Sequence, residues 1–463
     1  MSEEIHYFTP QNVLGTDGLL ARKMRGYEAR PQQIAMAEAI LDVFLKKQHL
    51  IVEAGTGVGK SFGYLVPAIL TSCQEYTRPT SGATERPFRR VVISTQTISL
   101  QEQLIEKDLP FLNSLIPLEF SFTLVKGRSN YICLRRLESA SRNALSLFTT
   151  QEEVEQLDDF RVWANQTYDG TQSDLHFAPL GRVWDEICCE SGNCLGKKCA
   201  HYSRCFYQVA RRRIRNAQIL VVNHALFFSD LAVRNKGGAI LPEYEAVVFD
   251  EAHSMEAVAG DHLGISLSNG QLEYMLHRLY NRRNDKGLLV QHGLKKAQRL
   301  ADVCVAVAND FFAQLCEWYN DKVAESRLQA RPKELRVRQK NVISNGLSEA
   351  LAELAGCVYN DAAGIDSPEA KLELELAFDR LNAAAAAVDS WVEQNQEGFV
   401  YWLHELPPVR GRWRAPRVEM CAAPVDVGPI LREKLFNPID SVVLTSATLS
   451  TAKRTTRGQA TRG

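Results

Sequence analysis

"HLIVEAGTGVGKSFGYLVPAIL" (residues 49–70) is the stretch of this 463-residue chain that decides its fold. A short apolar run at residues 50–52 leads into a glycine-rich turn, and the turn opens a segment with the apolar spacing of a helix. Glycines let a backbone fold tightly, and the N–H groups at the start of a helix attract an anion. A strand, a loop and a helix in this order predict a phosphate-binding loop in a mostly parallel α/β sheet.

The residues of this loop predict an ATP site. Lys60 would reach the β- and γ-phosphates, and the Ser61 hydroxyl would coordinate Mg²⁺. Ala54 stands where the general pattern has glycine. A glycine-rich turn with a chance lysine is the alternative, and the flanking strand and helix argue against it. The predicted ATP-binding residues of the loop are Ala54, Gly55, Thr56, Gly57, Val58, Gly59, Lys60 and Ser61.

A second segment, "EAVVFDEAHSME" (245–256), supplies the acidic groups that ATP hydrolysis needs. A buried strand is expected at residues 246–249, and ligand-handling residues of a parallel sheet gather at the carboxyl ends of its strands. Asp250 would hold Mg²⁺ through its water shell, and Glu251 would orient and deprotonate the attacking water. Together with Lys60, Glu251 is the predicted catalytic residue. His253 would link the nucleotide site to a neighbouring element. An acidic strand end without function is the alternative.

Charge and hydropathy exclude several other classes of protein. The chain has 54 Lys and Arg against 55 Asp and Glu, so any site for a polyanion must be a local basic patch. The N-terminus "MSEEIHYFTPQ" has neither the basic nor the apolar region of a secretory signal. No run approaches the roughly 18 apolar residues of a membrane helix. We therefore expect a cytoplasmic protein without a membrane partner.

Cysteines cluster in "CCESGNCLGKKCAHYSRC" (188–205), which holds five of the eleven in the chain. In the cytoplasm, clustered cysteines bind metal more often than they form disulfides. Four thiolates suit an iron–sulfur cluster or a structural zinc ion. Zinc sites usually use closely spaced pairs, whereas the spacings here are of four and five residues. The spacing alone leaves both metals open, and ordinary buried thiols remain a third interpretation.

Several further segments resemble the XPD/DinG group of superfamily 2 DNA helicases, which are iron–sulfur enzymes. "YEARPQQIAMAEAI" (27–40) resembles the adenine-recognition segment of that group, with Arg30 and Gln33 at the expected spacing for ATP binding. The other matches are "VVISTQTISLQEQL" (91–104), similar to motif Ia along the single strand; "VVNHALFFSDL" (221–231), similar to a segment shortly before the DEAH box; and "SVVLTSATLS" (441–450), similar to motif III.

This resemblance implies an ATP-dependent DNA helicase that moves 5′ to 3′ on single-stranded or forked DNA in repair or replication. Ser446 and Thr448 of motif III, together with His253, would couple hydrolysis to strand movement. ATP, Mg²⁺ and a [4Fe–4S] cluster are the implied cofactors. The family's cluster ligands correspond here to Cys133, which follows "KGRSNY", and to Cys194, Cys199 and Cys205. Cys188 and Cys189 compete with this choice, since Cys189 precedes Cys194 by the same spacing.

Basic residues flank the cysteines on both sides. Such charge runs are usually solvated helix faces, but beside a cluster domain they could hold DNA phosphates, with an aromatic ring stacking on a base. The first group is Lys126, Arg128, Arg135 and Arg136 around Tyr131, and the second is Arg211, Arg212, Arg213 and Arg215.

The predicted fold is a RecA-like α/β P-loop domain whose parallel sheet is interrupted by two insertions. Strands are expected at 48–53, 91–95, 219–222, 246–250 and 441–446. The expected parts are the RecA-like domain at 1–125, 207–254 and 416–450, an Fe–S domain at 126–206, a helical Arch-like insertion at 255–415, and an unstructured basic tail at 451–463.

Two rival functions remain open. The family continues after motif III into a second RecA-like domain with the arginines that complete the ATP site, whereas this sequence continues as "TAKRTTRGQATRG". A truncated, non-catalytic module that binds ATP and single strands is therefore one rival. A zinc-stabilised regulatory NTPase is the other.

Overall fold

The computed structural model describes residues 8–73, 76–77, 84–85, 90–234, 238–325, 332–406 and 417–449. The chain divides into two compact units, which are described separately. Unit 1 comprises Met1–Lys126, Arg212–His262 and Val427–Gly463, and unit 2 comprises Gly127–Arg211 and Leu263–Asp426. The basic tail expected at 451–463 lies outside the described residues.

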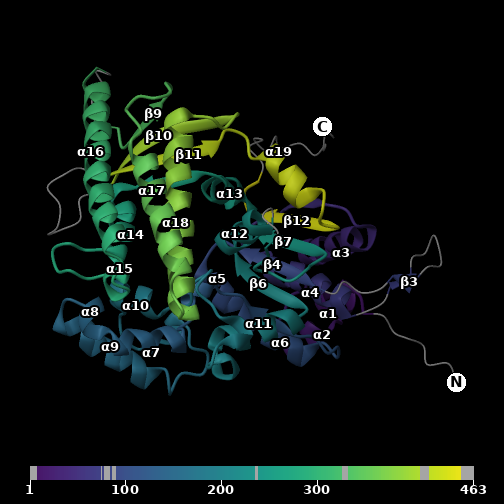
Figure 1. Cartoon of the computed structure of the whole chain (residues 1–463). Helices are drawn as coiled ribbons and strands as arrows, with labels where there is room; N and C mark the ends of the chain where they lie inside the picture. Colours follow the sequence, from purple (N-terminus) through teal and green to yellow (C-terminus); the bar gives the residue numbers. More distant parts are fainter. Residues whose placement is uncertain are drawn as a thin grey trace. The chain divides into compact units, whose positions relative to one another are not determined.

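Unit 1 is built on a six-stranded sheet whose strands all run parallel (Figure 1). The predicted α/β fold class is confirmed. Its central strands are continuous apolar runs that are buried along their whole length, as expected for a parallel sheet covered on both faces. In sheet order the strands are β1 (Leu50–Glu53), β12 (Ser441–Ser446), β7 (Ala246–Asp250), β4 (Val91–Thr95), β6 (Ile219–Asn223) and β5 (Phe122–Leu124).

Helices follow the strands of unit 1 and pack on the sheet. The helix after the glycine-rich turn, α4 (Lys60–Cys73), is buried from Gly63 to Ser72 and packs against α3 (Pro31–Lys46). The helix predicted after β4 begins as α5 (Ile98–Gln103) and continues as a π-helical turn. The remaining α-helices are α1 (Pro10–Leu14), α2 (Leu19–Lys23), α6 (Leu109–Leu115), α12 (His224–Arg234), α13 (Met255–Leu263) and α19 (Gly428–Leu431), while α11 (Phe206–Asn216) enters from unit 2; β2 (Tyr76–Thr77) and β3 (Thr84–Glu85) form a short antiparallel pair.

Unit 2 contains the cysteine-rich segment and the long helical region. The cysteine-rich part packs around buried aromatic rings, with the Phe160 and Trp184 ring centroids 5.6 Å apart. Its helices are α7 (Leu134–Arg142), α8 (Ala144–Leu147), α9 (Gln151–Trp163) and α10 (Gly181–Ile187). The helical region has α14 (Asn269–Leu279), α15 (Leu288–Gln291), α16 (Lys295–Glu325), α17 (Leu347–Ala363) and α18 (Pro368–Glu393).

The region expected to be helical also carries a four-stranded antiparallel sheet, ordered β8-β11-β10-β9. Its strands are β8 (Ile265–Ser268), β9 (Glu334–Val337), β10 (Phe399–Leu406) and β11 (Arg417–Pro424). Strand β11 was expected in the RecA-like domain, but it pairs with β10 along eight residues of unit 2. Unit 1 accordingly resumes at Val427 rather than at residue 416.

A buried arginine fixes the amino ends of three strands in unit 1. Arg90, directly before β4, donates from its guanidinium to the carbonyl oxygens of Ala217 at 2.9 Å, Arg215 at 2.7 Å and Glu243 at 2.5 Å. These acceptors lie just before β6 and β7, the two strands next to β4. One planar group therefore satisfies carbonyls from both neighbouring segments.

We expect Arg90→Met to lower the free energy of unfolding of unit 1 by about 3 kcal/mol, because three buried carbonyls lose a charged donor. Arg90→Lys should recover only part of this, since an ammonium cannot reproduce the fork. Urea unfolding followed by circular dichroism measures the effect, with the exposed Arg25→Met as the matched control. Equal stability of Arg90→Met and Arg25→Met would contradict this assignment.

Candidate nucleotide and cysteine sites

The glycine-rich turn between β1 and α4 is held from one side by the start of α3. Gly57 and Gly59 both have φ of +85°, a conformation that suits glycine. The Gln33 amide donates to the Gly59 carbonyl at 2.8 Å, and the Arg30 guanidinium donates to the Gly57 carbonyl. A Cβ at Gly59 would collide with the Gln33 side chain. The structure therefore places both predicted adenine-segment residues against the turn.

The acidic residues after β7 meet the lysine of α4. Lys60 Nζ lies 2.6 Å from Glu251 Oε1 and 3.9 Å from Asp250 Oδ1. Burial raises the pKa of Asp250 despite hydrogen bonding and the nearby lysine. Partial burial alone would raise the pKa of Glu251 too, but the hydrogen bond and charge of Lys60 lower it overall. Glu251 is thus kept ionised and half-exposed, beside a buried Asp250.

The end of β12 closes the site from the other side. Ser446 Oγ donates to Glu251 Oε2 at 3.2 Å and lies 2.9 Å from His253 Nδ1. The Thr448 N–H points to Ser446 Oγ at 3.3 Å. Glu251 itself has φ 55° and ψ 46°, a left-handed conformation that is strained for a side chain of this size. All three residues predicted to couple the site to its surroundings are therefore linked to Glu251.

One residue of this site was missed by the sequence analysis. Tyr64 is fully buried, and its hydroxyl donates to Asp250 Oδ2 at 2.9 Å. It lies four residues after Lys60 on α4, so the two side chains share a helix face. This spacing was the available signal, but a tyrosine within an apolar helix looks like an ordinary core residue.

The cysteine site forms where two distant segments pair as short strands. The Cys189 N–H donates to the Tyr131 carbonyl and the Cys133 N–H to the Ile187 carbonyl, both at 2.8 Å. This pairing, centred on an antiparallel bridge between Ile132 and Cys188, brings the first cysteine beside the later group.

Cys189 lies at the centre of the gathered thiols. It is buried and packs with Cys133 and Cys205 under the Tyr131 and Tyr207 rings. The close Cys189 thiol lowers the pKa of the Cys133 and Cys205 thiols to about 6 each, and its own pKa is raised by them. The Cys189 thiol itself donates to the Ile132 carbonyl at 3.6 Å. The Cys199 thiol is close enough to both to interact electrostatically.

Three of the four predicted cluster ligands are thus gathered, whereas Cys194 is exposed. Thiols with a lowered pKa are chemically suited to a metal or an iron–sulfur cluster. Within the described ranges, no three His, Cys, Asp or Glu side chains stand in an arrangement that could hold a metal ion. The donor chemistry fits a cluster, but the described residues do not form the arrangement that would hold one.

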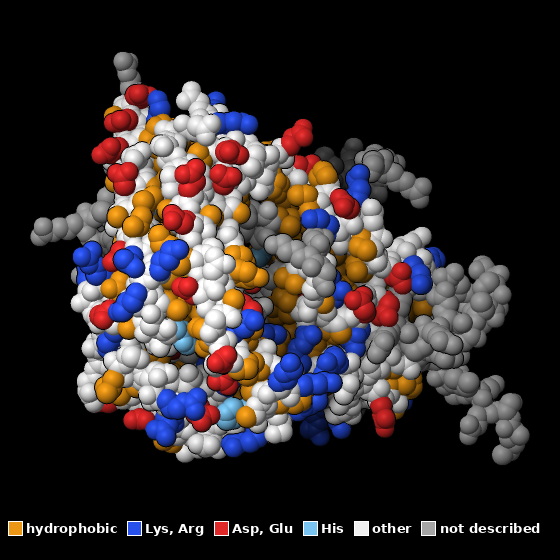
Figure 2. Space-filling model, viewed as in Figure 1, with side chains coloured by type: hydrophobic (Ala, Val, Ile, Leu, Met, Phe, Trp, Pro, Cys, Tyr) orange, Lys and Arg blue, Asp and Glu red, His pale blue; other side chains and the backbone are white. Residues whose placement is uncertain are grey.

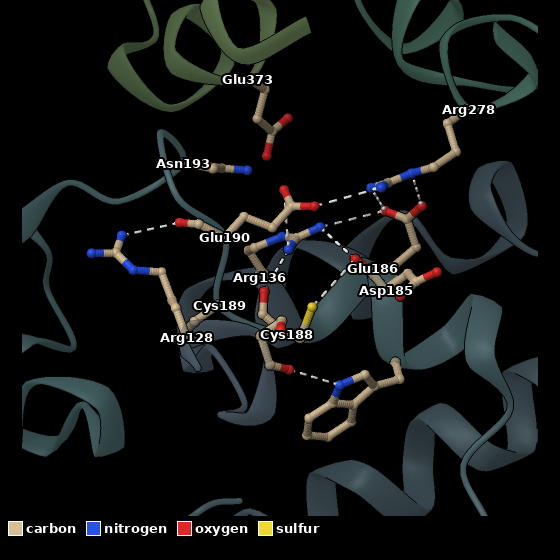
Figure 3. Close-up of polar contacts among 12 residues, drawn as sticks. Arg128, Arg136, Asp185, Glu186, Cys188, Cys189, Glu190, Asn193, Arg278 and Glu373 are labelled. Atoms are coloured by element: carbon tan, nitrogen blue, oxygen red, sulfur yellow. Dashed lines mark hydrogen bonds and ion pairs between the residues drawn. The ribbon is translucent and has the colours of Figure 1, made fainter. Parts of the chain in front are cut away.

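The arginines expected to hold DNA phosphates beside Cys133 have other partners. Arg136 is buried, donates to the Cys188 carbonyl and lies 3.2 Å from Glu190 Oε2 (Figure 3). Arg135 is also buried and donates to the Asn193 side chain. Arg128 lies 4.4 Å over the Tyr207 ring. The expected role of Arg135 and Arg136 on the surface was therefore wrong.

Glu190 is the centre of this buried charge network. Its carboxylate also lies 3.0 Å from Arg380 on α18 and 3.5 Å from Arg278 on α14. The network borders a cavity of about 770 Å³ within unit 2. It joins the segment after Cys189 to the helical region of the same unit, so the cysteine loop and two long helices share one set of ion pairs.

The second basic group is exposed, unlike the first. Arg212, Arg213 and Arg215 are exposed on α11, and Figure 2 shows Lys and Arg side chains gathered where Figure 1 places this helix.

No helix in the described segments has the length and apolar character to span a bilayer.

Comparison with known proteins finds similar helicases. Residues 191–272 match the family model DEAD_2. The ATP-dependent DNA helicase YoaA of Escherichia coli (strain K12) is 31% identical over 443 residues, which is 94% of this chain. These similarities support an XPD/DinG-type chain of superfamily 2.

Two further relatives show a similar likeness. YoaA of Haemophilus influenzae is 28% identical over 399 residues, covering 84% of this chain and 56% of the relative. The Bacillus subtilis protein named 3′-5′ exonuclease DinG is 25% identical over 471 residues, covering 94% of this chain and 47% of the relative. The chain spans 62% of the E. coli protein, so it matches about half to three fifths of these relatives.

We expect Tyr64→Phe to weaken metal binding beside Asp250 on the order of 10-fold, because the buried carboxylate loses a donor that orients it. Electron paramagnetic resonance with Mn²⁺ and a non-hydrolysable ATP analogue measures the affinity without turnover. Tyr244→Phe removes a hydroxyl from another buried tyrosine of unit 1 and serves as the control. Unchanged Mn²⁺ affinity in Tyr64→Phe would show that Tyr64 does not orient Asp250.

Proposed function

We propose that this chain is the ATP-hydrolysing part of a DNA helicase of its family. The observation that carries the proposal is the meeting of Lys60, Glu251 and Ser446 at the carboxyl ends of adjacent parallel strands. Both YoaA relatives are named as DNA helicases, which supports DNA as the substrate. Movement from 5′ to 3′ on single-stranded or forked DNA, and a cytoplasmic location, are the family's expectations for this chain.

The ATP site would work through groups already close together. The N–H groups of the turn would hold the phosphates, and Lys60 would transfer its hydrogen bond from Glu251 to the β- and γ-phosphate oxygens. Glu251, released from the lysine, would orient the attacking water and accept its proton. Asp250 and Ser61 would hold Mg²⁺, which neutralises charge on the phosphates.

Ser446 links the hydrogen bonding of Glu251 to the segment after β12. It contacts both Glu251 and His253, and its strand β12 continues toward Thr448. A change in the hydrogen bonding of Glu251 on hydrolysis would therefore alter the contacts of Ser446 at the end of β12. We propose this link as the start of the coupling between hydrolysis and strand movement.

We also propose a [4Fe–4S] cluster held by Cys133, Cys194, Cys199 and Cys205. The similarity to the family and the lowered pKa of the neighbouring Cys133 and Cys205 thiols support it. Such a cluster would join segments some sixty residues apart into one structural element. Cys189 is the alternative fourth ligand, because it already lies between Cys133 and Cys205.

We expect Lys60→Ala and Glu251→Gln each to lower DNA-stimulated phosphate release by about 10²-fold or more, through lost phosphate binding and lost water activation respectively. Lys46→Ala, which removes an exposed lysine of α3, is the control. Full turnover by Lys60→Ala would refute the phosphate-loop assignment. Background turnover by the unmutated chain, with ATP still bound, would favour the non-catalytic binding module.

We expect anaerobically purified protein to be brown and to contain about four irons per chain. Cys199→Ser should bleach it, because a cluster ligand is lost, whereas Cys188→Ser, a buried neighbour, should retain the iron. Iron analysis of Cys194→Ser and Cys189→Ser separates the two possible fourth ligands: loss in the first supports the proposed set, and loss in the second assigns Cys189 instead. Zinc without iron in the unmutated protein would contradict the cluster.

A further inference from the structure

His224 is a buried residue that the proposed mechanism does not use. It is the first residue of α12, directly after β6, within the "VVNHALFFSDL" segment. Its ring Nδ1 lies 2.7 Å from Ser94 Oγ on β4, and its ring centroid lies 5.7 Å from that of Phe249 on β7. Since β4 lies between β6 and β7, the ring of His224 at the end of β6 contacts both of these strands, Ser94 on β4 and Phe249 on β7.

Phe249, which the ring contacts, directly precedes Asp250 and Glu251. Burial lowers the pKa of His224 to about 4, while backbone groups of Asp250 and Glu251 act in the opposite direction. The ring is therefore neutral near pH 7. A neutral ring has one N–H, and in the tautomer with that proton on Nε2, Nδ1 accepts the hydrogen bond of the Ser94 hydroxyl.

The Nε2 atom of His224 is available for a hydrogen bond. It is a buried nitrogen with no hydrogen-bond partner within bonding distance in the part of the chain that the structure describes. A buried donor without an acceptor is unfavourable, so a small shift that closes a bond to the Asp250 or Glu251 backbone is favoured. Glu251 has a strained, left-handed backbone conformation. A new contact with this turn would therefore change the position of its carboxylate.

The Ser94 end of this connection leads to an exposed surface. Ser94 is followed by Thr95, whose hydroxyl donates to the Thr97 carbonyl, and the Thr97 side chain caps α5. Gln96 and Thr97 are exposed, and Ile98 is 67% exposed. Polar groups that can bind phosphate and an exposed apolar side chain that can contact a base suit single-stranded nucleic acid.

We propose that His224 is a positioning residue that couples single-stranded DNA at the turn after β4 to Glu251. This inference rests on the proposed function and specifies how that site is regulated. DNA on residues 96–98 shifts the end of β4, Ser94 moves with it, and the neutral ring passes the shift to the backbone that carries Glu251. An ordinary buried histidine is the alternative, and it predicts lost stability without lost coupling.

The coupling is measured at equilibrium, using the full chain, a fluorescein-labelled (dT)₂₀ strand, and Mg²⁺ with a non-hydrolysable ATP analogue. In the unmutated chain the analogue should change the Kd for the strand on the order of 10-fold. His224→Phe and Ser94→Ala should each bring this ratio close to 1 while the Kd of the analogue alone stays within about twofold. His224→Gln, whose amide reaches as far as Nε2, should recover part of the ratio.

A double variant tests whether both residues act through one connection. If they do, combining His224→Phe with Ser94→Ala changes the ratio no further than either substitution alone. Phe227→Leu, a buried change in the same helix, is the control for altered packing and should keep the ratio.

The inference is overturned if the His224 and Ser94 variants keep the unmutated ratio. It is also overturned if the analogue leaves strand binding unchanged in the unmutated chain, or if that chain does not bind the strand. Absence of phosphate release alone contradicts the proposed hydrolysis but leaves the ratio measurable, so the two failures are distinguishable.

Discussion

The pairing of β12 with both β1 and β7 is the constraint on which the nucleotide site depends. Glu53 pairs with Ser446, and Thr445 pairs with Asp250, so three segments separated by some two hundred residues each end at one edge of the sheet. Because the strands are parallel, their carboxyl ends all lie at the same edge of the sheet. The ion pair between Lys60 and Glu251 follows from this register, since the lysine begins the helix after β1 and the glutamate follows β7.

Unit 2 depends on a different constraint, the need to pair buried charge. Arg136 is buried and Glu190 is partly buried, and an unpaired charge at either position would be costly. Arg278 and Arg380 complete the set from two helices that lie far away in the sequence. Ion pairs with Glu190 thus join the cysteine loop to the helical region, which explains why they form one compact unit.

The contrast between these constraints explains which features could be predicted. The strands and the ATP site are encoded in short motifs, so β4, β7 and β12 and the assignment of Lys60 and Glu251 to one ATP site were expected from local sequence. Arg135 and Arg136 were misread because their partners lie about 50 to 240 residues away, where charge patterning gives no signal. The sheet of unit 2 was missed for a similar reason, since β8 and β9 have four residues each and gain their identity only by pairing with β10 and β11.

The same reasoning bears on Cys189. Spacing treats Cys189 and Cys194 as equivalent, since each precedes another cysteine of the run by five positions. The pairing of residues 131–133 with 187–189 distinguishes them, because it fixes Cys189 against the backbone of Tyr131 while Cys194 lies on an exposed loop. A ligand set with Cys194 therefore requires that loop to fold inward, whereas Cys189 needs no movement to stay among the sulfurs. Even where Cys194 is the ligand, the buried Cys189 would stay beside the sulfurs, where burial and hydrogen bonding would tune the reduction potential of a bound cluster.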